Sequence, residues 1–394
     1  MIPVASAKAI IRQNILPLRP VQLPLQLAQG LVLADDITAT MDIPAFPQSS
    51  MDGYAFSFSS WQPGQGLKII GEMPAGSNEV FSLSGGEAVR IFTGAAVPPG
   101  TDTVVMQERV TVINGLLHIE DEKLAERGNV RPTGSEIKSG ALALTAGIVL
   151  TPAAIGFLAG IGVTHVYVYP KPVIGLLVTG KELQQPGNPL EYGQVYESNS
   201  STIRAALEQL QIMEVKLFWA DDDLDMLTGV LEAALQQSDM VLLTGGVSVG
   251  DYDFVLEAAS RCGVATLFHK IKQRPGKPLF FGKKGDQLVF GLPGNPSSVL
   301  TCFYEYVTPA LYRLSNKKMD LKNLQVPLGK GYQKGPGLTH FLKGWYDGEK
   351  VIPLEAQESY RLSSFAKANC LVQLEENGTL YNEGDTVEIH ILPD

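Results

Sequence analysis

The chain has 394 residues and a formal net charge of −10 at neutral pH. That length suits two to four domains at roughly 150 residues each, and the negative charge argues against a surface built as a whole to bind nucleic acid or an anionic membrane. The 40 glycines and 25 prolines fall in clusters without a period, which excludes collagen and low-complexity sequence.

The N-terminal part of the chain predicts two domains, one inserted into the other. Residues 4–40 contain a helical pattern followed by a short apolar strand. Short β runs separated by Gly, Pro and Asn turns come next, which is typical of antiparallel sheet. The segment TPAAIGFLAGIGV then predicts a helix with Pro152 in its first turn. The predicted bounds are 1–45 and 139–170 for a discontinuous, helix-rich linker and dimer domain I, and 46–138 for an inserted β domain II.

From residue 171 the pattern changes to that of a parallel α/β sheet. Apolar β runs (VIGLLVTG, VKLFWADD, DMVLLTGG and QLVFGLPG) alternate with helical patterns at 200–211 and 224–237. From residue 315 onward, short strands with GKG, DGE, ENG and NEGD turns replace the helical period. We therefore predict an α/β domain III over 171–314 and a C-terminal β-barrel, domain IV, over 315–394.

The cysteines and the apolar stretches bear on the compartment. Cys262, Cys302 and Cys370 lie far apart without zinc-ligand spacing, so we expect three buried thiols. The N-terminus lacks a charged segment followed by a long apolar one, and His165 and several glycines interrupt the longest apolar stretch. We therefore expect a cytoplasmic protein without a signal peptide, a membrane span or a nucleic-acid partner.

Glycine or carboxylate clusters follow the predicted strands of the α/β domain, namely TGKEL, ADDD, TGGVSVGDYD and LPGNP. Because parallel strands end at one edge of a sheet, we expect these segments to form a ligand crevice there. TGGVSVG could bring backbone N–H groups to an anion or could be an ordinary turn, and it lacks the lysine of a P-loop and the spacing of a dinucleotide site. Asn295 in LPGNP could expose helix N–H groups at the mouth of the crevice or could be only a helix cap.

A basic segment, HKIKQRPGK at 269–277, stands out in this acidic chain. Its cations suit a compact oxyanion, although a charge run is often only a solvated surface. Glu182, Asp222 and Asp253 carry the hard oxygen donors that Mg²⁺ prefers, although carboxylates at helix N-termini are often caps. Together these residues indicate a site for phosphate, a divalent metal and a further anion.

Two further strings, SSMDGYAF and IFTGAAVPPGTDTVVMQE, lie in the N-terminal half. Asp52 in the first could be a functional carboxylate or a turn residue before Gly53. The scattered histidines form no nucleophile or metal triad, so a Ser-His-Asp hydrolase or a zinc deaminase is unsupported.

Seven strings, in the order MDGYA, TGAAVPPGTDTVVMQE, VTGKEL, YESNS, LLTGGVSVGDYDF, RPGKP and GLPGNP, closely resemble the molybdopterin molybdenumtransferase (MoeA) family, which includes the E domain of gephyrin. The resemblance spans nearly the whole chain. It implies insertion of molybdate into adenylylated molybdopterin, with Mg²⁺-assisted loss of AMP and release of molybdenum cofactor. It also implies an elongated homodimer of four-domain subunits that share their active sites, and it suggests molybdopterin adenylyltransferase and molybdoenzyme apoproteins as protein partners.

Family positions carried onto this sequence, together with the motifs that follow the predicted strands, give the candidate site residues. The candidates for catalysis are Asp52, Glu182, Asp222 and Asp253, of which the last three are candidate metal ligands. The candidates for contact with the pterin substrate are Thr93, Thr179, Gly180, Asn199, Gly245, Gly246, Ser248, Gly250, Lys270, Pro293, Gly294, Asn295 and Pro296. The candidates for molybdate are Arg274, Lys277, Lys343 and Ser359. Glu136 matches a position of the linker segment that is commonly Asp.

Two residues depart from the family pattern and bear on metal affinity and molybdate placement. Lys181 stands in TGKEL where an acid is usual, and Lys343 stands where an arginine is common, whose bidentate fork it cannot form. Two alternatives stay open. One is a molybdopterin adenylyltransferase-like enzyme, against which the β domains and LPGNP argue. The other is a non-catalytic scaffold paralogue, for which we would expect an attached partner domain or a long linker.

Overall fold

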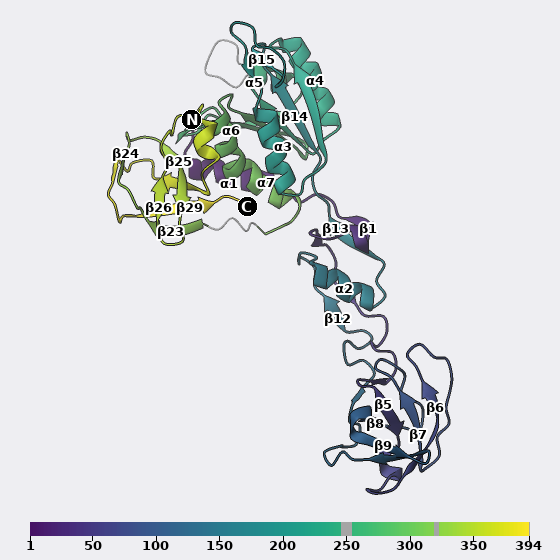
Figure 1. The fold of residues 1–394 in the computed structure, drawn as a ribbon. Coiled ribbons are helices and arrows are strands. Elements are labelled where there is room, and N and C mark those ends of the chain that lie inside the picture. The colour runs from purple at the N-terminus through teal and green to yellow at the C-terminus, as the bar shows by residue number, and fades with distance from the viewer. Residues whose placement is uncertain (246–253, 319–322, 394) are drawn as a thin grey trace. The chain divides into compact units, whose positions relative to one another are not determined.

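The computed structural model describes residues 1–245, 254–318 and 323–393. The chain forms two compact units. The first unit consists of Met1–Val21 and Val168–Asp394, and the second unit consists of Gln22–Tyr167. Figure 1 shows the helices and strands of both units.

A six-stranded sheet in the order β17-β14-β18-β22-β21-β19 forms the centre of the first unit. Its strands are β14 (Ile174–Thr179), β17 (Val215–Ala220), β18 (Met240–Thr244), β19 (Ala265–His269), β21 (Phe280–Lys284) and β22 (Gln287–Leu292). β17, β14, β18 and β22 run parallel, which confirms the predicted parallel α/β domain. β21 and β19 add an antiparallel edge that the sequence did not predict. Residues 285–286 alone join β21 to β22, and so short a loop can join only antiparallel strands.

Helices cover both faces of this sheet, because its central strands are apolar on both sides. Leu242 of β18 belongs to a core shared with α1, α3, α6 and α7, whereas its neighbours Val241 and Leu243 belong to a core shared with α4 and α5. The helices are α1 (Val4–Asn14), α3 (Asn199–Gln209), α4 (Leu224–Gln236), α5 (Phe254–Arg261), α6 (Pro296–Cys302), the π-helical turn η4 (Phe303–Val307) and α7 (Thr308–Leu314). α3 and α4 confirm the helices predicted at 200–211 and 224–237.

Helix α1 belongs to the first unit, which includes Met1–Val21. The buried face of α1, with Val4, Ala7 and Ile11, packs into the core that holds α7. The hydrophobic periodicity of the sequence predicts a helix and its buried face, but it does not predict which part of the protein packs against that face. The predicted bounds of domains I to IV stay predictions.

The first unit also contains the predicted C-terminal β domain, which has its own apolar core. Its main sheet has the order β20-β25-β27-β29-β23, with β26 paired to β25. The strands are β20 (Gln273–Arg274), β23 (Asn323–Pro327), β25 (Thr339–Tyr346), β26 (Val351–Pro353), β27 (Cys370–Leu374) and β29 (Thr386–Ile391). β20 comes from the basic segment and pairs in parallel with the start of β25. The basic segment therefore joins the α/β domain to the C-terminal sheet.

The second unit is mainly β structure, as the Gly, Pro and Asn turns predict. Its main sheet has the order β8-β5-β7-β6-β10-β9, mostly antiparallel, with a parallel β6–β7 pair. Those strands are β5 (Gly53–Phe56), β6 (Leu67–Met73), β7 (Glu87–Ile91), β8 (Thr103–Met106), β9 (Val110–Ile113) and β10 (Leu116–Ile119). The helix α2 (Pro152–Gly160) confirms the predicted helix and its early proline, and the Thr151 hydroxyl caps it by accepting from the Ala154 N–H at 3.2 Å.

Two expectations about the chain as a whole can be compared with the fold. Cys262, Cys302 and Cys370 are free and buried, as expected. None of the helices in the described ranges is both long and apolar enough to span a bilayer.

Candidate functional site

The four parallel strands of the α/β sheet end in register. Thr179 at the end of β14 pairs with Ala220 of β17, and Thr244 at the end of β18 pairs with Leu292 of β22. The segments that follow these strands therefore leave one edge of the sheet, as predicted. Of the predicted substrate and metal residues at this edge, Gly246, Ser248, Gly250 and Asp253 lie outside the described residues.

Two acidic candidates flank one turn at this edge. The Thr179 hydroxyl, which is buried, donates to Asp222 Oδ1 at 2.9 Å, and the Lys181 N–H donates to Asp222 Oδ2 at 3.4 Å. Gly180 lies between them, and a Cβ there would come within 3.1 Å of Glu182 Oε2. Asp222 and Glu182 thus approach the same turn from two segments, and the unexpected Lys181 contributes its backbone rather than a second acid.

Gly245 requires the absence of a side chain. Its φ is +87°, and a Cβ there would lie 1.9 Å from the Thr179 carbonyl oxygen. The end of β18 therefore approaches β14 closely, which only glycine permits. The first glycine of the TGG string is therefore required for steric reasons.

The LPGNP segment connects the sheet edge to the C-terminal β domain. The Asn199 side chain at the start of α3 donates to the Gly294 carbonyl at 2.9 Å. Asn295 Nδ2 donates to Ser359 Oγ at 3.0 Å, and the Ser297 N–H donates to the Ser359 carbonyl at 3.0 Å. Asn295 occupies the N-cap position of α6 but makes no side-chain cap, because its amide is directed to Ser359. The structure thus brings together Asn199, Gly294, Asn295 and Ser359, which the sequence named separately.

Arg274 and Lys277 have exposed side chains, and neither forms an ion pair or side-chain hydrogen bond with the part of the chain that the structure describes. Lys270 is half-buried and has a φ of +68°. Backbone hydrogen bonds hold it on both sides, from the Ile2 N–H to its carbonyl and from its N–H to the Leu279 carbonyl. The two exposed cations are therefore free to meet an anion.

Lys343 has a different environment from the one expected of a molybdate ligand. Its side chain is buried in β25, and its ammonium donates to the carbonyls of Ala356 at 2.8 Å, Arg361 at 3.1 Å and Glu358 at 3.4 Å. Burial lowers the pKa of Lys343. Three acceptors match the three N–H bonds of an ammonium, so the geometry supports a role for Lys343 in holding the loop that carries Ser359. Contact of Lys343 with molybdate stays a prediction that these bonds do not favour.

Asp52 and Thr93 meet in the second unit. Asp52 precedes β5 and Thr93 follows β7, and these strands pair so that Gly53 lies opposite Ile91. Asp52 Oδ1 accepts from the Thr93 N–H at 2.8 Å and from its hydroxyl at 2.7 Å. The backbone and hydroxyl hydrogen bonds from Thr93 lower the pKa of the exposed Asp52. The MDGYA and TGA strings thus form one feature of the second unit.

Two of the three predicted metal ligands, Glu182 and Asp222, lie at the sheet edge. The described ranges contain no group of three His, Cys, Asp or Glu side chains placed to hold a metal ion, and the third predicted ligand, Asp253, lies outside those ranges. Glu182 and Asp222 supply hard oxygen donors beside one turn, which suits a Mg²⁺ ion that keeps several waters.

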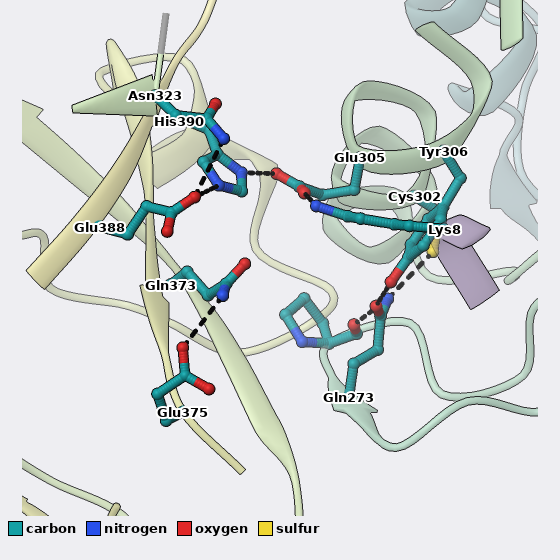
Figure 2. Close-up of polar contacts among 11 residues, drawn as sticks. Lys8, Gln273, Cys302, Glu305, Tyr306, Asn323, Gln373, Glu375, Glu388 and His390 are labelled. Carbon is teal, nitrogen blue, oxygen red and sulfur yellow. Dashed lines mark hydrogen bonds and ion pairs between the residues drawn. The ribbon is translucent and has the colours of Figure 1, made fainter. Parts of the chain in front are cut away.

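Two groups of buried polar contacts have no counterpart in the motifs of the sequence. Gln273, Cys302 and Tyr306 surround the turn of the basic segment, and Glu305 contacts Lys8 and His390 (Figure 2). Glu305 and His390 are 85 positions apart and belong to no shared motif. A buried Glu or Gln within an apolar segment is the only signal that could have pointed to these groups.

Comparison with known proteins agrees with this architecture along the whole chain. The family model of the MoeA N-terminal region (domain I and II) matches residues 2–162, that of the probable molybdopterin binding domain matches 175–313, and that of the MoeA C-terminal region (domain IV) matches 325–392. The fold and site therefore define a multidomain protein built on an α/β domain of the molybdopterin-binding type.

Relatives and solved structures specify the family within that class. A molybdopterin molybdenumtransferase of Haemophilus influenzae is 35% identical over 380 residues, which are 95% of this chain and 94% of the relative. One of Staphylococcus aureus is 33% identical over 401 residues, covering 98% and 95%. The crystal structure of the molybdopterin biosynthesis MoeA protein from Pyrococcus horikosii superimposes with a TM-score of 0.83 and 28% identity over 99% of both chains. The chain belongs to the MoeA family of molybdopterin molybdenumtransferases.

Proposed function

We propose that this protein inserts molybdate into adenylylated molybdopterin, with Mg²⁺-dependent release of AMP, to form molybdenum cofactor. Family membership over the full length supports the reaction class. The observation that carries the proposal for this chain is the presence of two contact pairs at one edge of the sheet, Thr179 with Asp222, and Asn295 with Ser359 of the C-terminal domain. It gathers carboxylates, hydroxyls and amides at the place where open α/β sheets bind ligands.

In this proposal the cationic side chains bind the molybdate oxyanion and the carboxylates bind the metal. Arg274 and Lys277 would hold the molybdate oxyanion, because their cationic groups are exposed and unpaired among the described residues. Glu182 and Asp222, together with Asp253, would hold Mg²⁺. When bound, Mg²⁺ supplies charge that polarises the pyrophosphate linkage and stabilises the departing AMP. Thr179 keeps Asp222 oriented by donating to Oδ1, and Oδ2 accepts one long bond from the Lys181 N–H, at 3.4 Å.

The test is conversion of adenylylated molybdopterin by the purified protein with molybdate and Mg²⁺, followed as AMP and molybdenum cofactor released. We expect turnover that needs both molybdate and the metal. Consumption of ATP with free molybdopterin, independent of molybdate, would instead support an adenylyltransferase. Binding of adenylylated molybdopterin without any turnover would support a non-catalytic scaffold.

Assembly belongs to the same proposal. A homodimer would let Asp52 and Thr93 of one chain serve the sheet edge of its partner, as the family resemblance implies. A location in the cytoplasm, and contacts with molybdopterin adenylyltransferase and molybdoenzyme apoproteins, also fit the proposed reaction.

A further inference from the structure

The buried side-chain amide of Gln273 holds the turn that carries Arg274 and Lys277 through hydrogen bonds to the backbone of the turn. Gln273 is 1% exposed, and its Nε2 donates to the Pro275 carbonyl at 2.9 Å and to the Gly276 carbonyl at 3.2 Å. A backbone bond from the Ile271 N–H to the Lys277 carbonyl, at 2.9 Å, closes the same turn. The Gln273 side chain thus donates to two successive carbonyls of this turn, whereas the side chains of Arg274 and Lys277 remain exposed.

The orientation of that amide is fixed by its surroundings. Carbonyl oxygens can only accept, so the nitrogen of Gln273 must face the turn and Oε1 must face away from it. Oε1 accepts from the Tyr306 hydroxyl (Figure 2). Tyr306 is 1% exposed, and burial raises the pKa of its hydroxyl well above the ordinary value, so the proton needed for this bond is retained. The turn carbonyls therefore determine which way the Gln273 amide points, and the Tyr306 hydroxyl supplies the donor that its buried oxygen needs.

The turn also rests directly on the helix that supplies Tyr306. Gly276 has a φ of +87°, and a Cβ there would lie 2.5 Å from Cys302 Sγ and 2.7 Å from Gln273 Nε2. Cys302 and Tyr306 are four positions apart on the continuous α6–η4 segment, so they present the same helical face. The backbone of the turn has no room to move toward the core, and the amide restrains it from moving away.

We propose that Gln273 and Tyr306 are positioning residues for oxyanion binding, in that they hold the 274–277 turn in the conformation that presents Arg274 and Lys277 together. The inference rests on the proposed function, which assigns molybdate to these two cations. Two long cationic side chains lose freedom when they bind one anion, and a backbone fixed beforehand reduces what is lost. Neither Gln273 nor Tyr306 touches substrate in this assignment, so their removal should affect the anion and leave the pterin largely unaffected.

The test compares Tyr306→Phe and Gln273→Met with Tyr304→Phe, a matched variant that removes a hydroxyl from the same helical segment. Tyr304 contacts the rings of Phe303 and Phe365 and is not in the amide network. For each protein we would measure molybdate binding by calorimetry, KM for molybdate, KM for adenylylated molybdopterin, and the melting temperature. Tyr306→Phe keeps the ring and its packing, so it is the variant expected to stay folded.

We expect Tyr306→Phe and Gln273→Met to raise KM and Kd for molybdate about tenfold, because a buried group loses its partner and the turn loosens. KM for the pterin substrate should change less than twofold, high molybdate should restore kcat, and Tyr304→Phe should match wild type. Unchanged molybdate binding in Tyr306→Phe, or equal changes in both KM values that follow the loss of melting temperature, would overturn the inference while leaving the proposed function intact. A wild-type protein that binds no molybdate would overturn both.

Discussion

Asp222 and Lys277 represent the two kinds of charge that the proposed reaction needs. Asp222 Oδ1 accepts a hydrogen bond from the Thr179 hydroxyl at 2.9 Å. The Lys277 side chain is exposed on the 274–277 turn. Substituting each one therefore separates metal handling from anion handling.

Asp222→Asn should retain molybdate affinity but require much more Mg²⁺ for AMP release. An amide oxygen can still accept the Thr179 hydrogen bond, but it brings no charge to a divalent ion. Lys277→Ala should do the reverse, with a loss of roughly 1.5–3 kcal/mol in molybdate binding, or about ten- to a hundredfold.

Activity titrated against molybdate and against Mg²⁺ measures both effects. Lys216→Ala, at an exposed lysine of β17, is the control for a lost surface charge. If both site variants shifted along the same axis, the division of roles would be wrong even though the family assignment stands.

At the scale of elements, the η4 turn joins α1 to the C-terminal sheet through ionic contacts of the buried Glu305. Glu305 accepts from Lys8 of α1 at 2.6 Å and contacts His390 Nδ1 of β29 at 2.6 Å, while His390 Nε2 contacts Glu388 at 3.0 Å (Figure 2). A neutral imidazole carries only one N–H, so two carboxylate contacts fit the protonated ring. Burial by itself would lower the pKa of His390, but the hydrogen bond and charge of Glu305 outweigh it and the pKa is raised.

This network predicts a pH-dependent contribution to stability. A group whose pKa is raised on folding stabilises fully below its unfolded value, about 6.5, and that contribution is lost as pH rises through the folded pKa. His390→Gln should therefore lower the free energy of unfolding by about 1–3 kcal/mol near pH 6, and the difference from wild type should shrink as the pH rises.

Denaturant unfolding between pH 4 and 9 measures this. His340→Gln is a control of opposite sign, because burial lowers the pKa of His340 to about 4. The pH-dependent part of its effect should appear between about pH 6.5 and 4. A constant difference between wild type and His390→Gln at all pH values would show that the protonated ring is not what stabilises this junction.

For the whole molecule, the predicted homodimer has a candidate surface on α2. Ala153, Gly156, Ala159 and Gly160 are exposed on this helix, and a Cβ at either glycine would meet no described atom within 4 Å apart from the neighbouring backbone of the helix itself. Small residues allow a second element to approach closely, and a two-fold dimer uses the same surface twice.

We expect light scattering at micromolar concentration to give the mass of a dimer for wild type and of a monomer for Gly156→Glu. Gly229→Glu places the same charge on an exposed glycine of α4 and should leave the dimer intact. Loss of turnover together with the dimer would support active sites shared between chains. A wild-type monomer with full turnover would contradict both the dimer and the sharing.

Local sequence determined the elements of this protein and the edge at which its motifs collect. The runs that became β14, β17, β18 and β22 are apolar enough to be recognised as buried strands, and parallel strands necessarily end on one edge, so Asp222 and Asn295 could be assigned there in advance. Gly245 was assigned to the same edge as part of a glycine-rich loop, whereas its close approach to the Thr179 carbonyl is visible only in the structure.

The tertiary structure alone decided which distant segments meet. The sequence of α1 predicts a helix with one buried face, but only the tertiary structure shows that this face packs in the same core as α7. The three carbonyls that accept from Lys343 belong to the loop at 356–361, and no sequence pattern around Lys343 predicted them. Glu305 contacts His390, and Gln273 contacts Tyr306, but no sequence motif or residue spacing predicts either pair. Periodicity reports how each segment relates to its own neighbours, whereas the partner of a buried polar group is set by which surfaces come together on folding.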